Sequence, residues 1–290
     1  MSSVRIGNSI ITPNSTFTIA EIGINHNGIL ENALKLIRLA KEAGFSAVKF
    51  QKRTVDKVYT QSELAAPRES IYGNSNGDLK RGLEFGVKEY DTIDDLCKSL
   101  GILWFASPWD EDSVDFLMKY SPVAFKIASP CLTNSKLLSK VAGTYMPIIL
   151  STGMSTMNQI ESALKIIKHK KVILLHCVST YPAKDTDLNL SVIEVLRKEF
   201  GLLVGYSGHE VGVLPSIIAA SRYHACVIER HVTLDRSMWG SDQSASLEVD
   251  GFRRLINYLE LAKKVEGDGI KKVIKDELPI IKKLRKIEDF

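Results

Sequence analysis

Short apolar segments alternate with helical segments along the whole of this 290-residue chain. Eight of them are rich in Val, Ile and Phe, as buried strands are. They read FTIAEIG (17–23), SAVKFQ (46–51), ILWFASP (102–108), VAFKIAS (123–129), IILST (148–152), VILLHCVS (172–179), LVGYSGH (203–209) and VIERHVT (227–233). Strict alternation of strand and helix implies parallel strands, and eight repeats predict a closed (β/α)8 TIM barrel. A doubly wound sheet is the alternative, but EIGINHNG after the first strand lacks its G-x-G-x-x-G turn.

The chain divides into three predicted parts. Residues 1–13 resemble a hairpin with Gly7-Asn8 at its turn, which could plug the bottom of the barrel. The barrel itself is expected over 14–268, and an amphipathic tail over 269–290. One connection, 53–87, is long and rich in Gly, Asn and Ser. Long loops in compact domains are usually functional, so we expect this segment to be a lid over the active-site face.

Composition excludes several classes of protein. The chain is 44% hydrophobic with a net charge of +4, which is typical of a globular domain. The basic tail also carries acids and apolar residues, so it does not predict a nucleic-acid arm. No apolar stretch is long enough for a membrane helix, and MSSVRIGNSI lacks the core of a signal peptide. Scattered cysteines without a C-x-x-C pair favour free thiols and a cytoplasmic location; they are Cys97, Cys131, Cys177 and Cys226.

Polar side chains end almost every predicted strand. They are Glu21, Asn25, Lys49, Gln51, Lys126, Ser129, Ser151, Thr152, His176, Ser179, Tyr181, Ser207, His209, Glu229 and His231. The carboxyl ends of barrel strands meet at one mouth, so these side chains should converge there. Side chains alternate along a strand, and Val48 and Phe50 suit the helix layer, which turns Lys49 and Gln51 inward. By the same rule Ser207 and His209 point to one side of their strand, and Glu229 and His231 point to one side of theirs. His176 has the opposite parity to Ser179, so its direction stays open.

Two kinds of chemistry follow from these residue types. Inward lysines with serine hydroxyls suit a phosphate and carboxylate group. His209 and His231, on adjacent strands, can share a divalent metal with positions left open for water or substrate. Glu21 opposite them could transfer protons or orient water. Each residue alone is weak support, because a single strand histidine is more often a hydrogen-bonded core residue; the convergence of many polar strand ends carries the interpretation.

Several motifs resemble those of the sialic acid synthase (N-acetylneuraminate synthase) family. They are IAEIGINHNG, AVKFQ, FASPWD, FKIASP, PIILSTGMST, LLHCVSTYP, GYSGHE and ERHVTLDRSMWGSDQSASLE, in order through nearly the whole chain. The resemblance implies a cytoplasmic, homodimeric TIM-barrel transferase for sialic acid biosynthesis. Such enzymes use Mn²⁺ or Mg²⁺ to condense phosphoenolpyruvate with an N-acetylated hexosamine of the N-acetylmannosamine type, and they release a nonulosonic acid and phosphate.

The resemblance also assigns roles to matching positions. Metal ligands are expected at His209 and His231, and Glu21 is expected to be the catalytic carboxylate. The amino-sugar contacts are expected at Gln51, Tyr181 and Asp242. Glu229 and Arg230 are expected to support the site rather than react. The phosphoenolpyruvate site is expected at Lys49, Lys126, Ser129, Ser151, Ser179 and Ser207.

Three departures from the family pattern affect these expectations. Family members usually carry a second, antifreeze-like domain that lends an Arg to the partner subunit's sugar site, and this sequence ends at Phe290. Sugar affinity or dimer geometry is then expected to differ, or a separate antifreeze-like cap domain is expected as a partner. Some members carry a carboxylate at the position of Cys131, which puts one expected sugar contact in question. Some members carry Asn at the position of Ser179, which is a smaller change in the expected phosphoenolpyruvate site.

Other functions stay open at this point. Within the same reaction, the product could be legionaminate, pseudaminate or a phosphorylated sialic acid. A Schiff-base aldolase using Lys49 or Lys126 would need no metal and would be trapped by borohydride. A non-catalytic sugar-binding barrel is disfavoured, because a simple binder has no need of the histidine pair or the lysines. No nucleic acid or membrane partner is expected.

Overall fold

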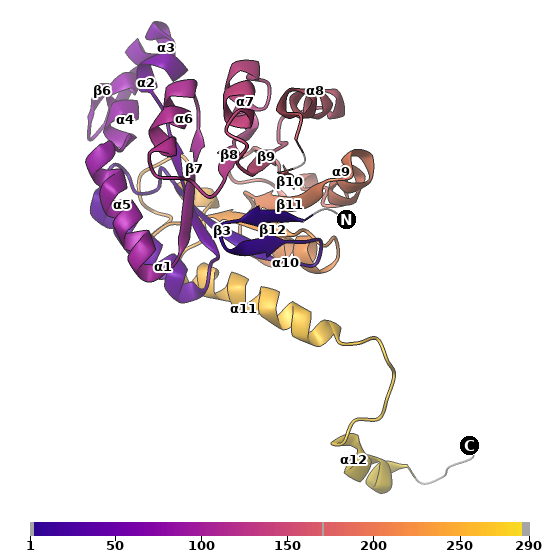
Figure 1. Cartoon of the computed structure of the whole chain (residues 1–290). Helices are drawn as coiled ribbons and strands as arrows, with labels where there is room; N and C mark the ends of the chain where they lie inside the picture. Colours follow the sequence, from indigo (N-terminus) through magenta and orange to yellow (C-terminus); the bar gives the residue numbers. More distant parts are fainter. Residues whose placement is uncertain (1–2, 170, 286–290) are drawn as a thin grey trace.

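The computed structural model describes residues 3–169 and 171–285 and shows a closed barrel of parallel strands (Figure 1). Each barrel strand overlaps a predicted segment, so the predicted (β/α)8 TIM barrel is confirmed. Around the barrel the order is β3-β4-β7-β8-β9-β10-β11-β12. The strands are β3 (Phe17–Gly23), β4 (Ala47–Lys52), β7 (Leu103–Pro108), β8 (Phe125–Ile127), β9 (Ile148–Ser151), β10 (Val172–His176), β11 (Leu203–Gly208) and β12 (Val227–His231).

Helices cover the outside of the strands, as Figure 1 shows. They are α1 (Leu30–Ala43), α5 (Val87–Leu100), α6 (Glu111–Met118), α7 (Ser135–Ala142), α8 (Met157–Ile167), α9 (Val192–Phe200), α10 (Leu214–Ser221) and α11 (Val249–Glu266). Val48 and Phe50 are fully buried in the apolar layer between strands and helices. The parity prediction is therefore confirmed, and Lys49 and Gln51 face the barrel interior.

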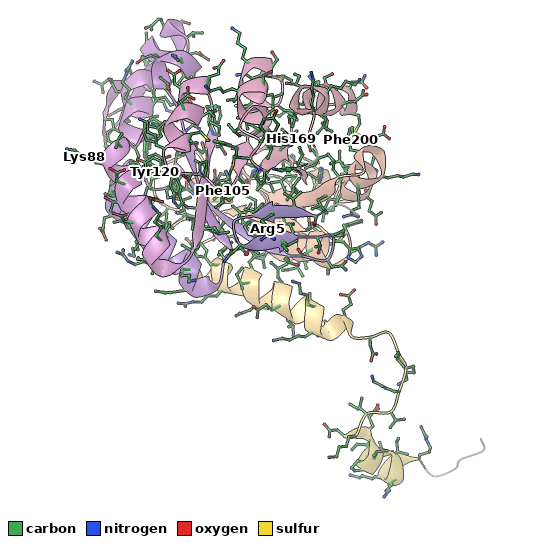
Figure 2. The ribbon with its side chains drawn as sticks, viewed as in Figure 1. Arg5, Lys88, Phe105, Tyr120, His169 and Phe200 are labelled. Atoms are coloured by element: carbon green, nitrogen blue, oxygen red, sulfur yellow. The ribbon has the colours of Figure 1, made fainter. Side chains whose placement is uncertain are left out.

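The lower half of the barrel interior is apolar. A hairpin of β1 (Val4–Ile6) and β2 (Ser9–Ile11) pairs Ile6 with Ser9 across the predicted Gly7-Asn8 turn. Its Val4 and Ile6 pack with inward strand residues such as Phe105, which Figure 2 labels. The hairpin thus closes the amino-terminal end of the barrel, and any ligand cavity has to open at the carboxyl-terminal end.

The segment predicted as a lid has secondary structure of its own. It contains α2 (Val55–Val58), α3 (Gln61–Ala65), β5 (Pro67–Ser70), β6 (Gly73–Ser75) and α4 (Asn76–Leu83). The Tyr72 hydroxyl donates to the carbonyl of Asn27 in the loop after β3. Gly28 has a positive φ of +71° there, and a Cβ on it would lie 2.1 Å from the Gly82 carbonyl oxygen. Only glycine allows this close approach, which fixes the lid against the rim of the barrel.

The chain beyond α11 leaves the barrel. The proposed boundary near 268 falls in irregular chain after α11, and α12 (Glu277–Leu284) has no buried residue. Figure 1 shows α12 apart from the barrel. Residues 286–290 of the proposed tail lie outside the described residues. Among the described helices, none combines the length and the apolar character that a membrane span requires.

Candidate active site

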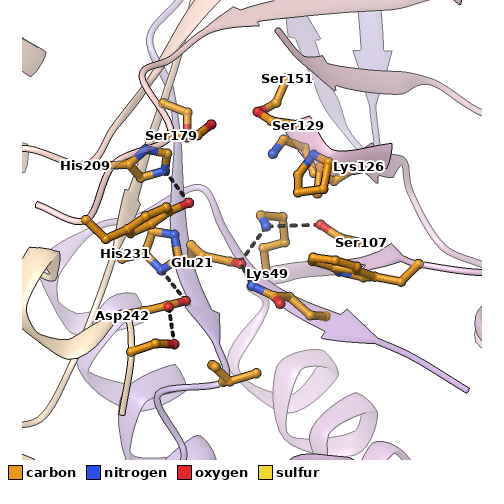
Figure 3. A pocket seen from close by; sticks show the side chains of 18 of the residues that line it. Glu21, Lys49, Ser107, Lys126, Ser129, Ser151, Ser179, His209, His231 and Asp242 are labelled. Carbon is orange, nitrogen blue, oxygen red and sulfur yellow. Dashed lines mark hydrogen bonds and ion pairs between the residues drawn. The ribbon is translucent and has the colours of Figure 1, made fainter. Parts of the chain in front are cut away.

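A cavity of about 340 Å³ opens at the carboxyl-terminal ends of the strands (Figure 3). This volume is in the range of small-molecule sites. Every site residue that the sequence predicted lines it: Glu21, Lys49, Gln51, Lys126, Ser129, Ser151, Ser179, Tyr181, Ser207, His209, His231 and Asp242. The structure therefore brings together side chains from seven barrel strands, or the loops after them, and from the loop after β12.

Four buried charges occupy the floor of the cavity. The register of β3 and β4 places Glu21 opposite Lys49, and Lys49 Nζ lies 2.7 Å from Glu21 Oε2. On the other side, Lys126 Nζ lies 3.1 Å from Glu229 Oε1, and Lys49 Nζ lies 3.8 Å from the same oxygen. Two carboxylates and two ammonium groups are thus paired in a cluster of no net charge. Pairing of this kind offsets the high cost of burying each charge separately.

The pKa values of the two carboxyl groups in this cluster are shifted in opposite directions. Burial raises the pKa of Glu21, and the Lys49 ammonium only partly opposes this effect. Burial would also raise the pKa of Glu229, but Lys126 and Lys49 outweigh it and hold this pKa at about 2. The pKa of Lys49 is lowered, mainly by burial. Glu229 is therefore a lasting counter-ion, whereas Glu21 is the carboxyl of the pair that takes up a proton more readily.

Hydroxyl groups surround the lysines. Ser107 accepts from Lys49 Nζ at 3.2 Å, and Ser207 donates to Glu229 Oε1 at 3.2 Å. Ser179 Oγ is buried and has no hydrogen-bond partner among the described residues. A buried hydroxyl without a partner is unfavourable, and the oxygen of a bound anion would satisfy it. Lysines with directed hydroxyls are the groups that a phosphate ester needs.

The two predicted metal ligands lie side by side at the mouth, because His209 follows β11 and His231 ends the neighbouring strand β12. The ring centroids of His209 and His231 are 5.4 Å apart. His209 Nδ1 lies 2.6 Å from the Val178 carbonyl, which can only accept, so the ring proton is on Nδ1. The lone pair of His209 is then on Nε2, which accepts from the Tyr181 hydroxyl at 3.1 Å. A backbone carbonyl that fixes the tautomer in this way is the usual support of a metal-ligating histidine.

Both histidines are suited to bind a cation. Burial is the main reason that the pKa of each is lowered to about 4, so both rings are neutral at pH 7. Buried His231 Nδ1 has no hydrogen-bond partner among the described residues and lies 3.6 Å from Asp242 Oδ2. No group of three or more His, Cys, Asp or Glu in the described chain is arranged to hold a metal. Two imidazoles fit a divalent metal only if water or substrate oxygens complete its coordination.

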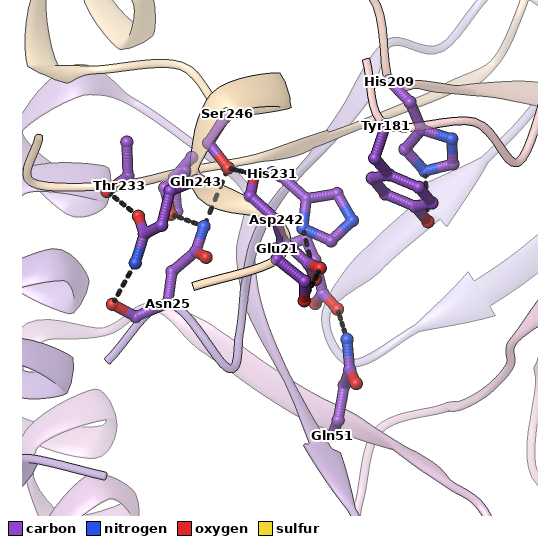
Figure 4. A network of polar contacts seen from close by, with 12 residues as sticks. Glu21, Asn25, Gln51, Tyr181, His209, His231, Thr233, Asp242, Gln243 and Ser246 are labelled. Atoms are coloured by element: carbon purple, nitrogen blue, oxygen red, sulfur yellow. Dashed lines mark hydrogen bonds and ion pairs between the residues drawn. The ribbon is translucent and has the colours of Figure 1, made fainter. Parts of the chain in front are cut away.

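A hydrogen-bond network holds the loop that carries Asp242 (Figure 4). Asn25 Nδ2 donates to the Val232 carbonyl at 2.9 Å and to Ser246 Oγ at 2.8 Å. Ser246 Oγ in turn donates to the Asp242 carbonyl at 2.6 Å. On the opposite side, Gln51 Nε2 donates to Glu21 Oε1 at 2.8 Å. Asn25, which the sequence analysis noted only as a polar strand end, is thus a positioning residue for the loop after β12.

Three other polar strand ends do not enter the cavity. Arg230 points outward and its Nη1 pairs with Glu210 Oε1 at 3.0 Å, both side chains being fully buried. His176 contacts the Leu188 carbonyl at 2.7 Å, which settles its direction as outward. Thr152 donates to the Leu175 carbonyl at 3.0 Å. These residues support the scaffold, as was expected for Arg230, whereas Glu229 is part of the charged floor.

The cavity contains residues that sequence reasoning missed. Ser107 shares the inward parity of Phe105, so the alternation rule could have found it. The remaining ones come mostly from the lid and from loops, where no periodic pattern indicates direction; they are Ile24, Arg53, Tyr59, Lys80, Trp109, Ala128, Pro130, Met154 and Ser241. Cys131, where some relatives of the predicted family carry a carboxylate, is buried and does not line the cavity.

Known proteins resemble this chain over most of its length. The NeuB family model matches residues 36–271. The N,N'-diacetyllegionaminic acid synthase of Legionella pneumophila is 37% identical over 279 residues, which covers 91% of this chain and 77% of that protein. The N-acetylneuraminate-9-phosphate synthase of Homo sapiens is 37% identical over 275 residues, covering 93% and 76%. The crystal structure of N-acetylneuraminic acid synthetase from Leptospira borgpetersenii, in complex with citrate, superposes with a TM-score of 0.83 at 32% identity, covering 99% and 98%.

Proposed function

The chain belongs to the NeuB family, and from that premise we propose that it condenses phosphoenolpyruvate with an N-acetylated hexosamine of the N-acetylmannosamine type. Its relatives are named as synthases of nonulosonic acids, which supports an enzyme that makes a sugar acid. The products would be a nonulosonic acid and phosphate.

One observation carries the proposal: buried Lys49 and Lys126 lie in the same cavity as two neutral histidines. The lysines and the serine hydroxyls supply charge and directed hydrogen bonds for the phosphate and carboxylate of phosphoenolpyruvate. Gln51, Tyr181 and Asp242 line the outer part, where the hydroxyls of a sugar would need partners.

The reaction joins two carbon atoms and breaks one carbon–oxygen bond. Carbon 3 of phosphoenolpyruvate attacks the aldehyde carbon of the open-chain sugar, whose oxygen takes up a proton. Water then adds at carbon 2, the bond from carbon 2 to the bridging oxygen breaks, and inorganic phosphate leaves with that oxygen. The added oxygen becomes the carbonyl of carbon 2, and its two protons balance the new sugar hydroxyl and the departing phosphate. A divalent metal, Mn²⁺ or Mg²⁺, held by His209 and His231, would polarise the aldehyde when bound.

The chain's own residues would orient the substrates and move protons. Lys126 and the serines hold the phosphate group while it becomes a leaving group, and Lys49 neutralises charge on the same molecule. Glu21 is within reach of Lys49 and Gln51, and its raised pKa suits a group that accepts a proton at one step and returns it at the next. Glu229 pairs with both lysines and orients them. Without a metal, Tyr181 donates to His209 Nε2; a metal held at that nitrogen would take the lone pair and leave the Tyr181 hydroxyl free for a sugar hydroxyl.

Phosphate release is the first test. The purified chain is incubated with phosphoenolpyruvate and Mn²⁺, with and without N-acetylmannosamine, and with the diacetylated hexosamines that lead to legionaminate or pseudaminate. Sugar-dependent release is expected, and His231→Ala should lower it at least about 100-fold through the lost metal contact. Exposed His224 has a positive φ of +50°, which Asn tolerates, so His224→Asn is the matched control and should keep full activity.

Other outcomes separate the alternatives. Release without metal, together with borohydride trapping on Lys49 or Lys126, would establish a Schiff-base aldolase instead. Sugar binding without turnover or bound metal would leave a non-catalytic barrel. The expected homodimer, cytoplasmic location and separate antifreeze-like cap domain belong to the same proposal. Sedimentation tests the homodimer, and cell fractionation tests the location. Turnover measured after addition of the cap domain tests whether that domain is a partner.

A further inference from the structure

A buried ion pair lies behind the two histidines, in the layer between strands and helices, and the proposed reaction does not use it. We propose that this pair, Arg230 with Glu210, is a clamp that positions the metal site by fixing His209 beside His231. The inference rests on the proposed role of the two histidines as metal ligands. It adds two positioning residues, neither of which lines the cavity.

The backbone alone does not fix the distance between the two histidines. The paired register of β11 and β12 ends at Gly208 with Arg230. His209 and His231 are the next residues along their strands, so each lies one residue beyond the last pair. On its other side His231 is paired with Glu21 of β3. A contact other than the strand pairing must therefore hold His209 beside His231.

The Arg230 side chain supplies a link across this gap. Its Nη2 donates to the Glu210 carbonyl at 2.6 Å, and its Nη1 donates to the Gly212 carbonyl at 2.6 Å. Glu210 directly follows His209 in the chain. Arg230 directly precedes His231, so its guanidinium joins the main chain beside one histidine to the main chain beside the other. A guanidinium suits this place, because it donates in several fixed directions at once.

The Glu210 carboxylate holds the guanidinium in place. Arg230 Nη1 lies 3.0 Å from Glu210 Oε1, and both side chains are fully buried. The Tyr206 hydroxyl donates to Glu210 Oε2 at 2.8 Å. Ser216 Oγ, on α10, accepts from Arg230 Nη1 at 3.0 Å. Gly208 leaves room for the carboxylate, because a Cβ there would lie 2.6 Å from Glu210 Oε2. The position of the ion pair is therefore fixed from several sides.

Stability does not explain an ion pair in this layer. The cost of taking both charges out of water can exceed their attraction, and apolar side chains of similar size are often at least as stabilising. The surrounding layer is apolar, and Ile228 and Val232 belong to it. An ion pair nevertheless provides directed hydrogen bonds, which apolar packing lacks. Its benefit is therefore expected in the position of the residues next to it.

The clamp complements the other contacts of His209. The Val178 carbonyl fixes the orientation of the His209 ring, and the Ala183 N–H donates to the His209 carbonyl at 3.0 Å. Both contacts tie His209 to the chain that follows β10, whereas the clamp ties it to β12. Two imidazoles at the mouth, with ring centroids 5.4 Å apart (Figure 3), can share a metal only while their separation is kept. Loss of the clamp should therefore weaken metal binding.

The test removes both charges at once and measures metal binding to the full chain. The double variant Glu210→Gln/Arg230→Met keeps side chains of similar size and an acceptor for the Tyr206 hydroxyl, and it leaves no buried charge unpaired. Urea unfolding of the metal-free protein should therefore resemble that of the native chain. Mn²⁺ binding, followed by electron paramagnetic resonance, should weaken at least about tenfold, the usual effect of losing groups that orient metal ligands. The spectrum of bound Mn²⁺ should also change.

Asp94→Asn is the matched control, because it neutralises another buried carboxylate. Asp94 Oδ2 lies 2.5 Å from Lys98 Nζ, and Asp94 Oδ1 accepts from Trp104 Nε1 at 2.9 Å. It lies on α5, which packs on β7, and β3 and β4 separate that strand from β12. Both the Mn²⁺ affinity and the spectrum should stay unchanged.

Tyr206→Phe is a milder variant that keeps the inference testable if the double variant does not fold. It removes only the hydrogen bond to Glu210 Oε2 and should weaken Mn²⁺ binding about two- to threefold. Mn²⁺ binding that is equal in the native chain and in the folded double variant would overturn the inference. So would native Mn²⁺ binding in Tyr206→Phe if that is the only variant that folds.

His231→Ala keeps this inference separable from the proposed reaction. Mn²⁺ binding that is lost in His231→Ala but unchanged in the double variant contradicts the clamp alone. Binding that the double variant weakens, without phosphate release from any sugar tried, supports the clamp and contradicts the condensation. Binding that His231→Ala leaves unchanged contradicts the metal role of the histidines and the clamp together.

Discussion

Replacing Glu229 with Gln is the sharpest test of the charged cavity floor. The change keeps the size of the side chain and an oxygen that can accept from Ser207, and it removes one negative charge. Lys49 would keep its contact with Glu21 at 2.7 Å. Lys126 would lose its only ion pair within the described residues, the 3.1 Å contact with Glu229 Oε1. The variant therefore leaves one buried ammonium without a counter-ion.

The magnitude follows from this count of partners. Removing one member of a buried ion pair typically lowers the free energy of unfolding by 3–5 kcal/mol, because the other charge stays buried and unpaired. One lysine loses its partner and the other does not, and the cavity opens to solvent, so we expect about 3 kcal/mol, at the lower end of that range. Phosphoenolpyruvate or inorganic phosphate should restore part of the loss, since an anion replaces the missing carboxylate beside Lys126.

Urea unfolding at pH 7, with and without phosphate, measures both effects. Glu199→Gln makes the same chemical change on the exposed side of α9 and should shift the free energy of unfolding by no more than about 0.5 kcal/mol. The reasoning would be refuted if Glu229→Gln unfolded like this control. A full loss of stability that phosphate does not reduce would also contradict it, because Lys126 would then not be an anion-binding group.

Three further predictions concern the cavity wall, the lid and acid stability. Gly153→Ala should raise the KM for phosphoenolpyruvate at least about tenfold, because its Cβ would lie 2.3 Å from Ser179 Oγ, and steady-state kinetics will show whether kcat changes instead. Tyr72→Phe removes the hydroxyl bonded to the Asn27 carbonyl and should speed proteolytic cleavage within 53–87 without shifting the melting temperature of the barrel by more than a few degrees. Burial lowers the pKa of His26 to about 3. Between pH 6.5 and pH 3, His26 is therefore protonated in the unfolded chain and neutral in the folded chain. Stability should fall by roughly 4 kcal/mol between pH 6.5 and pH 3 from this group, and a His26→Phe variant that keeps the same slope in pH-dependent unfolding would contradict it.

Periodicity was sufficient to predict the barrel and the direction of side chains such as Lys49 and Gln51. Each strand is buried on both sides, so the residues near its amino-terminal end are almost all apolar. Inward and outward residues can be told apart only near its carboxyl-terminal end, where the inward residues are polar. Lys49 and Phe50 illustrate this, since one lies in the cavity and the other in the layer under the helices. His176 could not be assigned from one strand, because its direction depends on the loop that brings the Leu188 carbonyl to it.

The position of the lid in the sequence could be predicted from its length and composition, but its helices and the side chains that it contributes to the cavity could not. Its helices are four to eight residues long, too short for a periodic pattern to indicate which face is buried. The contributions of Arg53 and Lys80 therefore depend on tertiary contacts, such as Tyr72 with Asn27, that have no local signal. The loop after β12 is similar, since Asn25, more than 200 residues away, holds it in place.

The distribution of charge inside the barrel explains why stability and chemistry can share the same strands. Inward residues near the strand beginnings, such as Phe105, pack with the hairpin and contribute apolar burial. Inward residues near the strand ends are charged, and Glu229 and Glu21 neutralise the lysines while no substrate is bound. A bound phosphate would add negative charge to a neutral cluster, so its binding must be favoured by the serine hydroxyls, by a metal at the histidines and by proton uptake at Glu21. We therefore expect phosphoenolpyruvate to bind more tightly once the metal is present, and equilibrium binding with and without Mn²⁺ measures that coupling directly.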